Sequence, residues 1–191
     1  DTGGTVIAIG ALPLSRPFLV PEALARMTAE RPDARFRIFE GSWRELVEPL
    51  RDGVIDFVVG ALRPHEISDL QQVPLVEDRL VIVAGRNHPL AGEAMPSWET
   101  LARYPWIVAP ENSPLRTQWE HLFAGRDLPD SPIECGSVMI IGRMLTTSSD
   151  FLTLLSPDQV ALQIRSGLLA QVGEPLANTL RVVGITTRLN W

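Results

Sequence analysis

Short apolar runs alternate with longer amphipathic stretches in the first third of the chain. Val6–Gly10 reads VIAIG, and this β-branched, uncharged composition is typical of a buried strand. Apolar side chains then recur at helical spacing between Pro17 and Arg31, and Arg35–Phe39 (RFRIF) alternates polar and apolar residues as a half-exposed strand does. The pattern therefore predicts a strand, a helix and a second strand.

A second helix and a third strand follow directly. Ser42 precedes Glu45 by three positions, which is the spacing of a capping box, and Gly53 ends the helical pattern. Ile55–Gly60 (IDFVVG) has the composition of another buried strand. Because the connections are short, we expect the three strands to be parallel neighbours in a β-α-β-α-β series. The polar stretch RPHEISDLQQ is interpreted as a connection to the next strand-like run, Leu80–Ala84.

A second series of strands and helices begins after a change in composition. Turn-forming residues gather in GRNHPLAGEAMPSWE, from Gly85 to Glu99, and indicate a boundary between two lobes. The stretch Leu180–Asn190 (LRVVGITTRLN) reads as a long late strand that is available to cross back. The elements expected between them are strands at 106–109, 133–135 and 151–155 and helices at 113–124, 138–147 and from Ser156 onward. We predict lobe I over residues 1–84 and 180–191 and lobe II over residues 85–179.

Composition and charge argue against several classes of protein. The net charge of −6 argues against this segment holding the phosphate backbone of nucleic acid by itself. No apolar run approaches the roughly 18 residues of a membrane helix, and no leader for export opens the chain. Cys135 is the single cysteine, which excludes an internal disulfide and is compatible with a reducing cytosol. We therefore expect a cytoplasmic globular protein without membrane contact.

Five stretches are similar, in their order, to one protein family. They are GTVIAIG near the start, ERPDARFRIFEGSWRELVEPLRDGVIDFVVG from Glu30, PLVEDRLVIVAGRNHPLAG from Pro74, YPWIVAPENSPLRTQWEHLFA from Tyr104 and SSDFLTLLSPDQV from Ser148. Together they resemble the effector-binding domain of LysR-type transcriptional regulators. The segments GALPLSR and VGALRP further resemble a subgroup that includes regulators of sugar uptake.

The resemblance implies an α/β fold of two Rossmann-like lobes joined by a two-strand hinge, the type 2 periplasmic-binding-protein fold. It implies that a small-molecule effector (an organic acid, sugar or sugar acid) binds in the cleft between the lobes and controls transcription. DNA would be contacted only by an N-terminal winged helix-turn-helix that this chain does not include. Homodimers or homotetramers are also implied, with RNA polymerase as a further candidate partner. The alternative function is that of a solute-binding protein of a transport system, which shares the fold.

Candidate ligand contacts in lobe I lie where strands give way to helices. Free N–H groups at helix N-termini attract anions, and an arginine can hold a carboxylate with two parallel hydrogen bonds. Each candidate also has a plainer interpretation, as a helix cap, a solvated arginine or a partly buried aromatic ring. By the resemblance, Leu14 stands where the family commonly places a hydroxyl residue. The candidates of lobe I are Pro13, Leu14, Ser15, Arg16, Ser42, Trp43 and Arg63.

Lobe II repeats this arrangement of polar residues after its strands. An indole ring at Trp43 would suit the face of a sugar, whereas several arginines favour an acidic metabolite, so the class of effector stays open. Ser148 and Ser149 are candidates for the far side of the cleft. The candidate ligand contacts of lobe II are Asn112, Ser113, Arg116, Ser137 and Val138.

The chain lacks an arrangement of residues typical of catalysis. His65, His88 and His121 are scattered, and none has the spacing of a metal ligand set. No G-x-S-x-G motif occurs, and Cys135 has no base beside it in the sequence. We therefore expect no catalytic residue, no metal and no cofactor, and a binding function rather than an enzymatic one.

Overall fold

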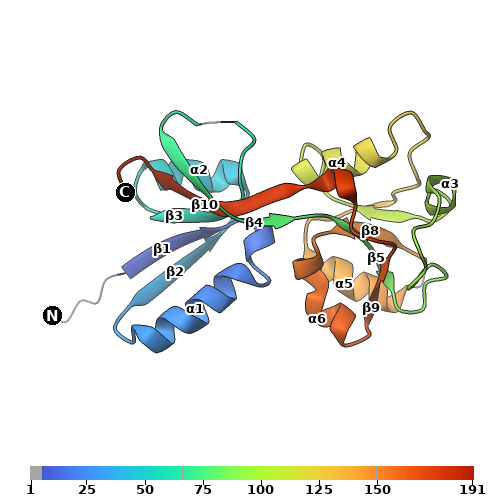
Figure 1. Ribbon diagram of the computed structural model, residues 1–191, viewed down its shortest axis with the longest axis horizontal. Coiled ribbons are helices and arrows are strands. Elements are labelled where there is room, and N and C mark those ends of the chain that lie inside the picture. Colours follow the sequence, from blue (N-terminus) through green and yellow to red (C-terminus); the bar gives the residue numbers. More distant parts are fainter. Residues whose placement is uncertain (1–5, 66, 149) are drawn as a thin grey trace. The chain divides into compact units, whose positions relative to one another are not determined.

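Ten strands form two five-stranded sheets in the residues that the computed structural model describes, 6–65, 67–148 and 150–191. The first sheet has the strand order β2-β1-β3-β10-β4 and the second has the order β7-β6-β8-β5-β9 (Figure 1). The strands of the first sheet are β1 (Val6–Ala11), β2 (Arg35–Glu40), β3 (Phe57–Ala61), β4 (Leu70–Asp78) and β10 (Arg181–Arg188). Those of the second are β5 (Val81–Gly85), β6 (Trp106–Val108), β7 (Ile133–Glu134), β8 (Leu152–Leu155) and β9 (Leu169–Val172).

Helices connect the strands of each sheet. The first sheet is accompanied by the 3-10 helix η1 (Pro13–Ser15) and by α1 (Leu19–Glu30) and α2 (Trp43–Arg51). The second is accompanied by α3 (Trp98–Leu101), α4 (Pro114–Leu122), α5 (Val138–Thr147), α6 (Pro157–Arg165) and the 3-10 helix η2 (Ala177–Thr179).

The chain divides into two compact units, one around each sheet. Unit 1 comprises the chain up to Asp78 together with Arg181–Trp191, and unit 2 comprises Arg79–Leu180. The sequence placed the first boundary after residue 84, whereas the structure places it after Asp78. The reason is that β5 pairs antiparallel with β8 and β9, so its hydrogen bonds hold it in the sheet of unit 2.

Unit 1 confirms the predicted β-α-β-α-β series. β1 is parallel to both β2 and β3, and α1 and α2 cover opposite faces of the sheet (Figure 1). Neighbouring residues of β3 show the alternation, because Val58 packs in the cluster with Leu50 of α2 while Val59 packs in the cluster with Val20 of α1. A strand buried on both faces explains the continuous apolar runs in the sequence.

The sheet of unit 1 also holds two antiparallel pairs. β10 is antiparallel to β3 on one side and to β4 on the other. The first residues of β4, Leu70–Gln72, were interpreted as part of a connection, because the stretch RPHEISDLQQ is polar and contains a proline; β4 itself also carries Pro74. β4 lies at the edge of the sheet, where a proline is tolerated, and the pairing register shifts opposite it, between Val183 and Gly184.

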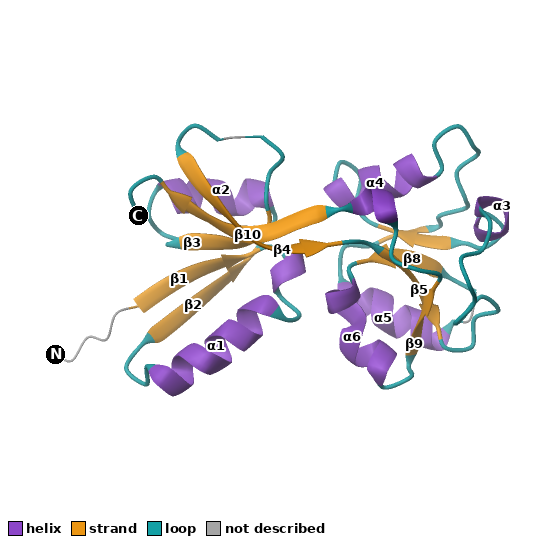
Figure 2. Cartoon of the chain, in the orientation of Figure 1, coloured by secondary structure: helices purple, strands orange, loops and turns teal. Residues whose placement is uncertain are grey.

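Unit 2 has an aromatic core on one face of its sheet. Trp106 of β6 lies 6.1 Å from Trp119 and 5.7 Å from Phe123 between ring centroids, and all three rings are buried. Ile141 and Leu145 of α5 pack on the other face (Figure 2). Helices on both faces agree with the predicted α/β class, although the short strand β9 and helix α3 were not anticipated.

Candidate ligand-binding site

The first three strands of unit 1 bring their carboxyl ends to one edge of the sheet. Ala11, the last residue of β1, is paired with Glu40 at the end of β2 and with Val59 near the end of β3. The loops that follow these strands therefore start side by side, although they lie far apart in the sequence (Figure 1). In open α/β sheets this edge is where ligands bind.

The turn after β1 is closed by Ser15. Both its backbone N–H and its hydroxyl donate to the Leu12 carbonyl, at 3.0 Å and 2.9 Å. Ser15 is fully buried, while Pro13 is exposed and Leu14 is half-buried. The Ser15 hydroxyl is therefore committed to the backbone and presents no surface to a ligand in this conformation.

Arg16 ties together the ends of the first two strands. Its Nε donates to the Ala11 carbonyl and its Nη2 donates to the Gly41 carbonyl, each at 3.0 Å. These carbonyls lie where the strands end, so the guanidinium satisfies acceptors that the sheet leaves open. Arg16 is thus neither a solvated side chain nor a free anion receptor, although its positive charge stays at this edge.

Ser42 begins α2 through the predicted capping box, which the structure confirms. The Ser42 backbone N–H donates to Glu45 Oε2 at 2.7 Å, and the hydroxyl donates to the same oxygen at 2.8 Å. These bonds lower the pKa of Glu45, and the nearby charge of Arg16 adds to the effect. Ser42 is exposed, so it remains accessible at the edge of the sheet.

Trp43, at the start of α2, and Arg63, in the loop after β3, come together. The guanidinium carbon of Arg63 lies 5.2 Å from the centre of the Trp43 ring, within the range of a cation–π contact. Arg63 Nη2 donates to the Ala61 carbonyl at 2.9 Å, whereas its Nε is buried without a hydrogen-bond partner. Burial lowers the pKa of this guanidinium, and no carboxylate of the described residues forms an ion pair with it.

Gln72 of β4 holds the backbone of the loop that carries Arg63. Its Oε1 accepts a hydrogen bond from the Arg63 N–H at 2.7 Å, and its Nε2 donates to the Arg63 carbonyl at 3.2 Å and to the His65 carbonyl at 3.3 Å. Sequence reasoning missed this residue. A glutamine in a strand carries no signal of its partners, which only the path of the loop reveals.

Arg116 of unit 2 is surrounded by acceptors. It donates to Glu120 at 2.8 Å, and its Nη1 lies 3.4 Å from both Glu134 and the Ala109 carbonyl. Its guanidinium carbon also lies 5.4 Å from the centre of the Trp119 ring. Two carboxylates neutralise this arginine, so it offers less to an incoming anion than Arg63 does.

The remaining predicted residues of unit 2 lie at two helix starts. Ser113 caps α4 by accepting from the Arg116 N–H at 3.2 Å, after Asn112 in the left-handed conformation (φ 61°). Ser137 caps α5 by accepting from the Ile140 N–H at 3.4 Å, and Val138 follows it half-buried. Because β6 and β7 are parallel, the structure brings these two helix starts to one edge of the sheet.

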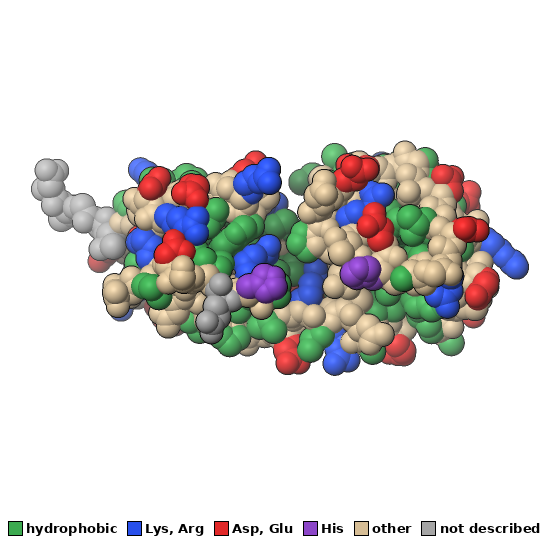
Figure 3. Space-filling model, turned by 90° about the horizontal axis from the view of Figure 1, so that it is seen from above, with side chains coloured by type: hydrophobic (Ala, Val, Ile, Leu, Met, Phe, Trp, Pro, Cys, Tyr) green, Lys and Arg blue, Asp and Glu red, His purple; other side chains and the backbone are tan. Residues whose placement is uncertain are grey.

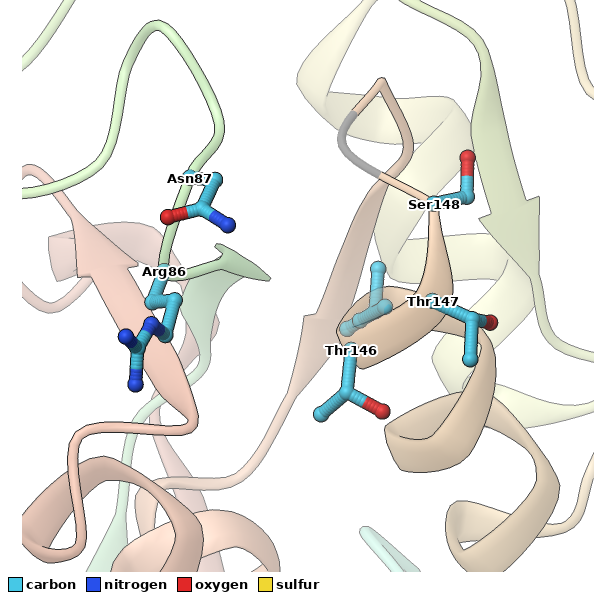
Figure 4. A pocket seen from close by; sticks show the side chains of 6 residues that line it. Arg86, Asn87, Thr146, Thr147 and Ser148 are labelled. Carbon is cyan, nitrogen blue, oxygen red and sulfur yellow. The ribbon is translucent and has the colours of Figure 1, made fainter.

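A separate hollow of about 130 Å³ lies at the other end of α5. In Figure 4, Arg86 and Asn87 stand on one side of it, while the Thr147 side chain points away from them. None of the ligand contacts predicted at the strand ends lines it, but Ser148, which was predicted for the far side of the cleft, does; Ser149 lies outside the described residues. The lining residues are Arg86, Asn87, Leu145, Thr146, Thr147 and Ser148.

Within the described ranges, no group of three or more His, Cys, Asp or Glu side chains is placed to hold a metal ion. None of the helices there is long and apolar enough to cross a membrane. On the face seen in Figure 3, arginines lie among acidic side chains and form no continuous basic surface. That distribution offers no extended track for a phosphate backbone.

Comparison with known proteins gives one consistent family. A family model described as the LysR substrate binding domain matches residues 2–188. The HTH-type transcriptional regulator GalR of Pseudomonas putida is 36% identical over 186 residues, which cover 96% of this chain and 46% of that protein. The chain spans about half the length of the curated relatives it matches. These relatives are named transcriptional regulators, a family that is not enzymatic.

Solved structures agree on the fold. The regulatory domain of CcmR of Synechocystis PCC6803, in complex with 2-PG, matches with a TM-score of 0.81 and 18% identity, covering 97% of this chain and 88% of that one. The effector binding domain of QuiR, in complex with shikimate, matches with a TM-score of 0.78 and 19% identity, covering 98% and 88%. The two-unit architecture is the predicted type 2 periplasmic-binding-protein fold. The chain belongs to the LysR family of transcriptional regulators, of which it is the substrate-binding domain.

Proposed function

We propose that this domain senses a small carboxylate, either an organic acid or a sugar acid, through the loops that follow β1, β2 and β3. In the whole protein, binding would alter transcription through an N-terminal winged helix-turn-helix. CcmR and QuiR support a small acidic effector, since one is bound to 2-PG and the other to shikimate, which is a carboxylate. Membership of a regulator family favours this function over that of a transport binding protein.

The observation that carries the proposal is the state of Arg63. Its guanidinium is partly withdrawn from water and has no anionic partner among the described residues, with Nε buried and unbonded. A buried charge without a partner is costly, and a bound carboxylate would supply both the missing charge and the missing acceptor. The adjacent Trp43 ring offers a flat apolar face to the rest of such a ligand.

The other predicted residues divide by how available they are. Ser42 is exposed beside this pair and is retained as a ligand contact, with Pro13 and Leu14 on the neighbouring turn. Arg16 contributes its charge while its described hydrogen bonds go to carbonyls, and the buried Ser15 is assigned a structural role. The contacts predicted in unit 2, and a ligand held between both units, stay predictions.

The test uses three acids of different shape: shikimate, gluconate and benzoate. At least one should stabilise the domain in a thermal-shift assay, and its neutral amide should not, because Arg63 requires the charge. Arg63→Met should weaken binding of that acid at least tenfold, about 1.4 kcal/mol, in a calorimetric titration.

Arg44→Met is the matched control. Arg44 lies next to Trp43 on α2 and is exposed, and its side chain makes no hydrogen bond or ion pair with described residues, so its loss should leave the affinity unchanged. Equal binding of acid and amide, or an Arg63→Met domain that binds as tightly as the parent, would reject the proposal.

We further propose that the domain assembles with a second copy as a homodimer or homotetramer. Val20 is the only buried residue of α1, and Phe18, which directly precedes the helix, is 53% exposed. β2 lies at an edge of its sheet with Ile38 exposed, so both elements leave apolar surface uncovered. A cytoplasmic location and contact with RNA polymerase also stay predictions.

A further inference from the structure

Gln72 connects two parts of unit 1 that the sheet itself does not join. β3 and β4 are both antiparallel to β10, so the segment between them must cross back over the sheet. Among the described residues of this segment, the last hydrogen bond to β10 is from the Leu62 N–H to the Val182 carbonyl, at 2.8 Å. Beyond Leu62, the side chain of Gln72 holds the backbone of Arg63 and the carbonyl of His65.

Both ends of the Gln72 amide serve that loop. Oε1 accepts from the Arg63 N–H, and Nε2 donates to the carbonyls of Arg63 and His65. Reversing the amide would place donor against donor and acceptor against acceptor, so these contacts fix its orientation. The side chain takes the place of a neighbouring strand by satisfying both backbone groups of Arg63.

Three contacts together leave Arg63 little freedom. Gln72 holds its backbone, the Ala61 carbonyl accepts from Nη2 at 2.9 Å, and the Trp43 ring lies 5.2 Å from the guanidinium carbon. Movement of the loop would swing the guanidinium away from the ring, because the two remaining contacts are made by the flexible side chain. The backbone contact is therefore the one that sets where the cation stands.

We propose that Gln72 is a positioning residue for effector recognition: it fixes the loop of Arg63 and so places the guanidinium beside Trp43, ready to receive a carboxylate. This inference rests on the proposed function, since it assumes that Arg63 contacts the effector. Gln72 acts through Arg63 and needs no contact of its own with the ligand. An arginine held in advance loses less conformational freedom on binding, which raises affinity.

The test compares Gln72→Met with Gln71→Met in the ligand-free chain. Gln71 is the neighbouring exposed residue, and its side chain makes no hydrogen bond with the described residues, which makes it a matched control. In nitrogen-15 NMR spectra, the Arg63 Nε–H resonance should carry a ring-current shift from Trp43. Gln72→Met should abolish that shift and remove hydrogen-exchange protection from the Arg63 backbone N–H, while Gln71→Met should change neither.

Binding gives the second readout. Whichever of shikimate, gluconate or benzoate binds the parent should bind Gln72→Met roughly fivefold more weakly, as the loss of a hydrogen bond predicts, and Gln71→Met equally well. Gln72→Ala serves as a second variant, so that the result does not depend on how one replacement packs. Near-UV circular dichroism verifies that each variant is folded.

The outcomes separate this inference from the proposed function. An Arg63 resonance that stays in place in both Gln72 variants would overturn the positioning role, and so would unchanged affinity where Arg63→Met loses affinity. If Arg63→Met binds the three acids as the parent does, the proposed site fails, and the role of Gln72 in recognition fails with it. A lost ring-current shift with weaker binding supports the inference.

Discussion

The guanidinium groups of Arg16 and Arg116 donate hydrogen bonds to groups at the ends of strands. Arg16 donates to the carbonyls of Ala11 and Gly41, and Arg116 reaches the Ala109 carbonyl and Glu134. Each arginine thereby joins the ends of two neighbouring parallel strands. All seventeen basic residues of the chain are arginines, and the planar fork of this side chain suits such paired contacts better than the point charge of a lysine.

His88 should make unit 2 sensitive to acid. It is buried, its Nδ1 accepts from the Leu90 N–H at 3.0 Å, and its ring lies 4.5 Å from that of Tyr104. Burial lowers the pKa of His88 below its ordinary 6.5, and the backbone and charge of Asp150 oppose that effect. In the unfolded state His88 binds a proton more tightly than in the folded state. The free energy of unfolding should therefore decrease as the pH falls below 6.5.

Urea unfolding followed by tryptophan fluorescence between about pH 8 and about pH 5 measures this effect, which is about 1.4 kcal/mol for each unit of pKa difference. His88→Gln should remove that part of the decrease, whereas His121→Gln, at an exposed position, should retain it. The assignment is wrong if His88→Gln and the parent lose stability in parallel over this range.

Residue-level predictions succeeded where the partners are close in sequence. Ser42 and Glu45 are three positions apart, so their capping box was predictable. Arg16 could not be resolved between a ligand contact and a solvated side chain, because its partner Gly41 comes from the end of another strand. The pairing of Trp43 with Arg63 likewise depends on how the start of α2 and the loop after β3 meet, which no spacing in the sequence encodes.

At the scale of elements, local signals gave the helix starts, and tertiary pairing decided the less regular strands. Ser156 and Gln159 form the capping box expected for α6, and Gly53 follows α2 with a φ of 76°, where glycine is favoured. β4 was obscured because it begins inside the polar stretch that ends at Gln72, and an edge strand tolerates polar residues and a proline that a central strand excludes. The short strand predicted at 133–135 is confirmed as β7, although it has only two residues.

We expect that Gly85, where β5 packs against α5, has no room for a side chain. A Cβ atom there would stand 2.1 Å from the backbone carbonyl oxygen of Leu145, which cannot rotate aside. Gly85→Ala should therefore lower the free energy of unfolding by about 1–3 kcal/mol or more, as overpacking does.

Gly142→Ala is the control for this substitution. Gly142 lies within α5, and a Cβ atom there meets nothing within 4 Å, so alanine should stabilise the helix by up to about 1 kcal/mol. Urea midpoints of the two variants give the comparison. Equal midpoints would show that the contact between β5 and α5 yields to the added atom.

At the scale of the whole molecule, the chain passes between the two units twice. In each unit, a contact joins the two residues that lie beside these crossings. In unit 1, Asp78 and Arg181 are register partners joined by an ion pair of 2.6 Å, with side chains only 13% and 15% exposed. In unit 2, the Leu80 N–H donates to the Thr179 hydroxyl at 2.9 Å. The change in composition near Gly85 did not reveal this boundary, because the residues that close it are ordinary strand residues.

Unit 1 should therefore fold without unit 2. Replacing residues 79–180 with Asn-Gly would join β4 to β10 through a two-residue hairpin turn, since Asp78 and Arg181 already face each other. We expect a cooperative urea transition and a native near-UV circular dichroism spectrum. The same deletion with Arg181→Met should be less stable, because the buried ion pair between Asp78 and Arg181 would be lost; a deletion variant that unfolds without cooperativity would contradict the expectation.

The central position of β10 has a consequence for the order in which the chain is built during synthesis. β10 lies between β3 and β4, yet it follows all of unit 2 in the sequence. Unit 2 is one continuous stretch, so the ribosome releases it complete while the sheet of unit 1 still lacks an interior strand, β10. Until β10 is synthesised, the edge of β3 that will pair with it stays unpaired. Unit 1 therefore begins to be synthesised first but completes its sheet last.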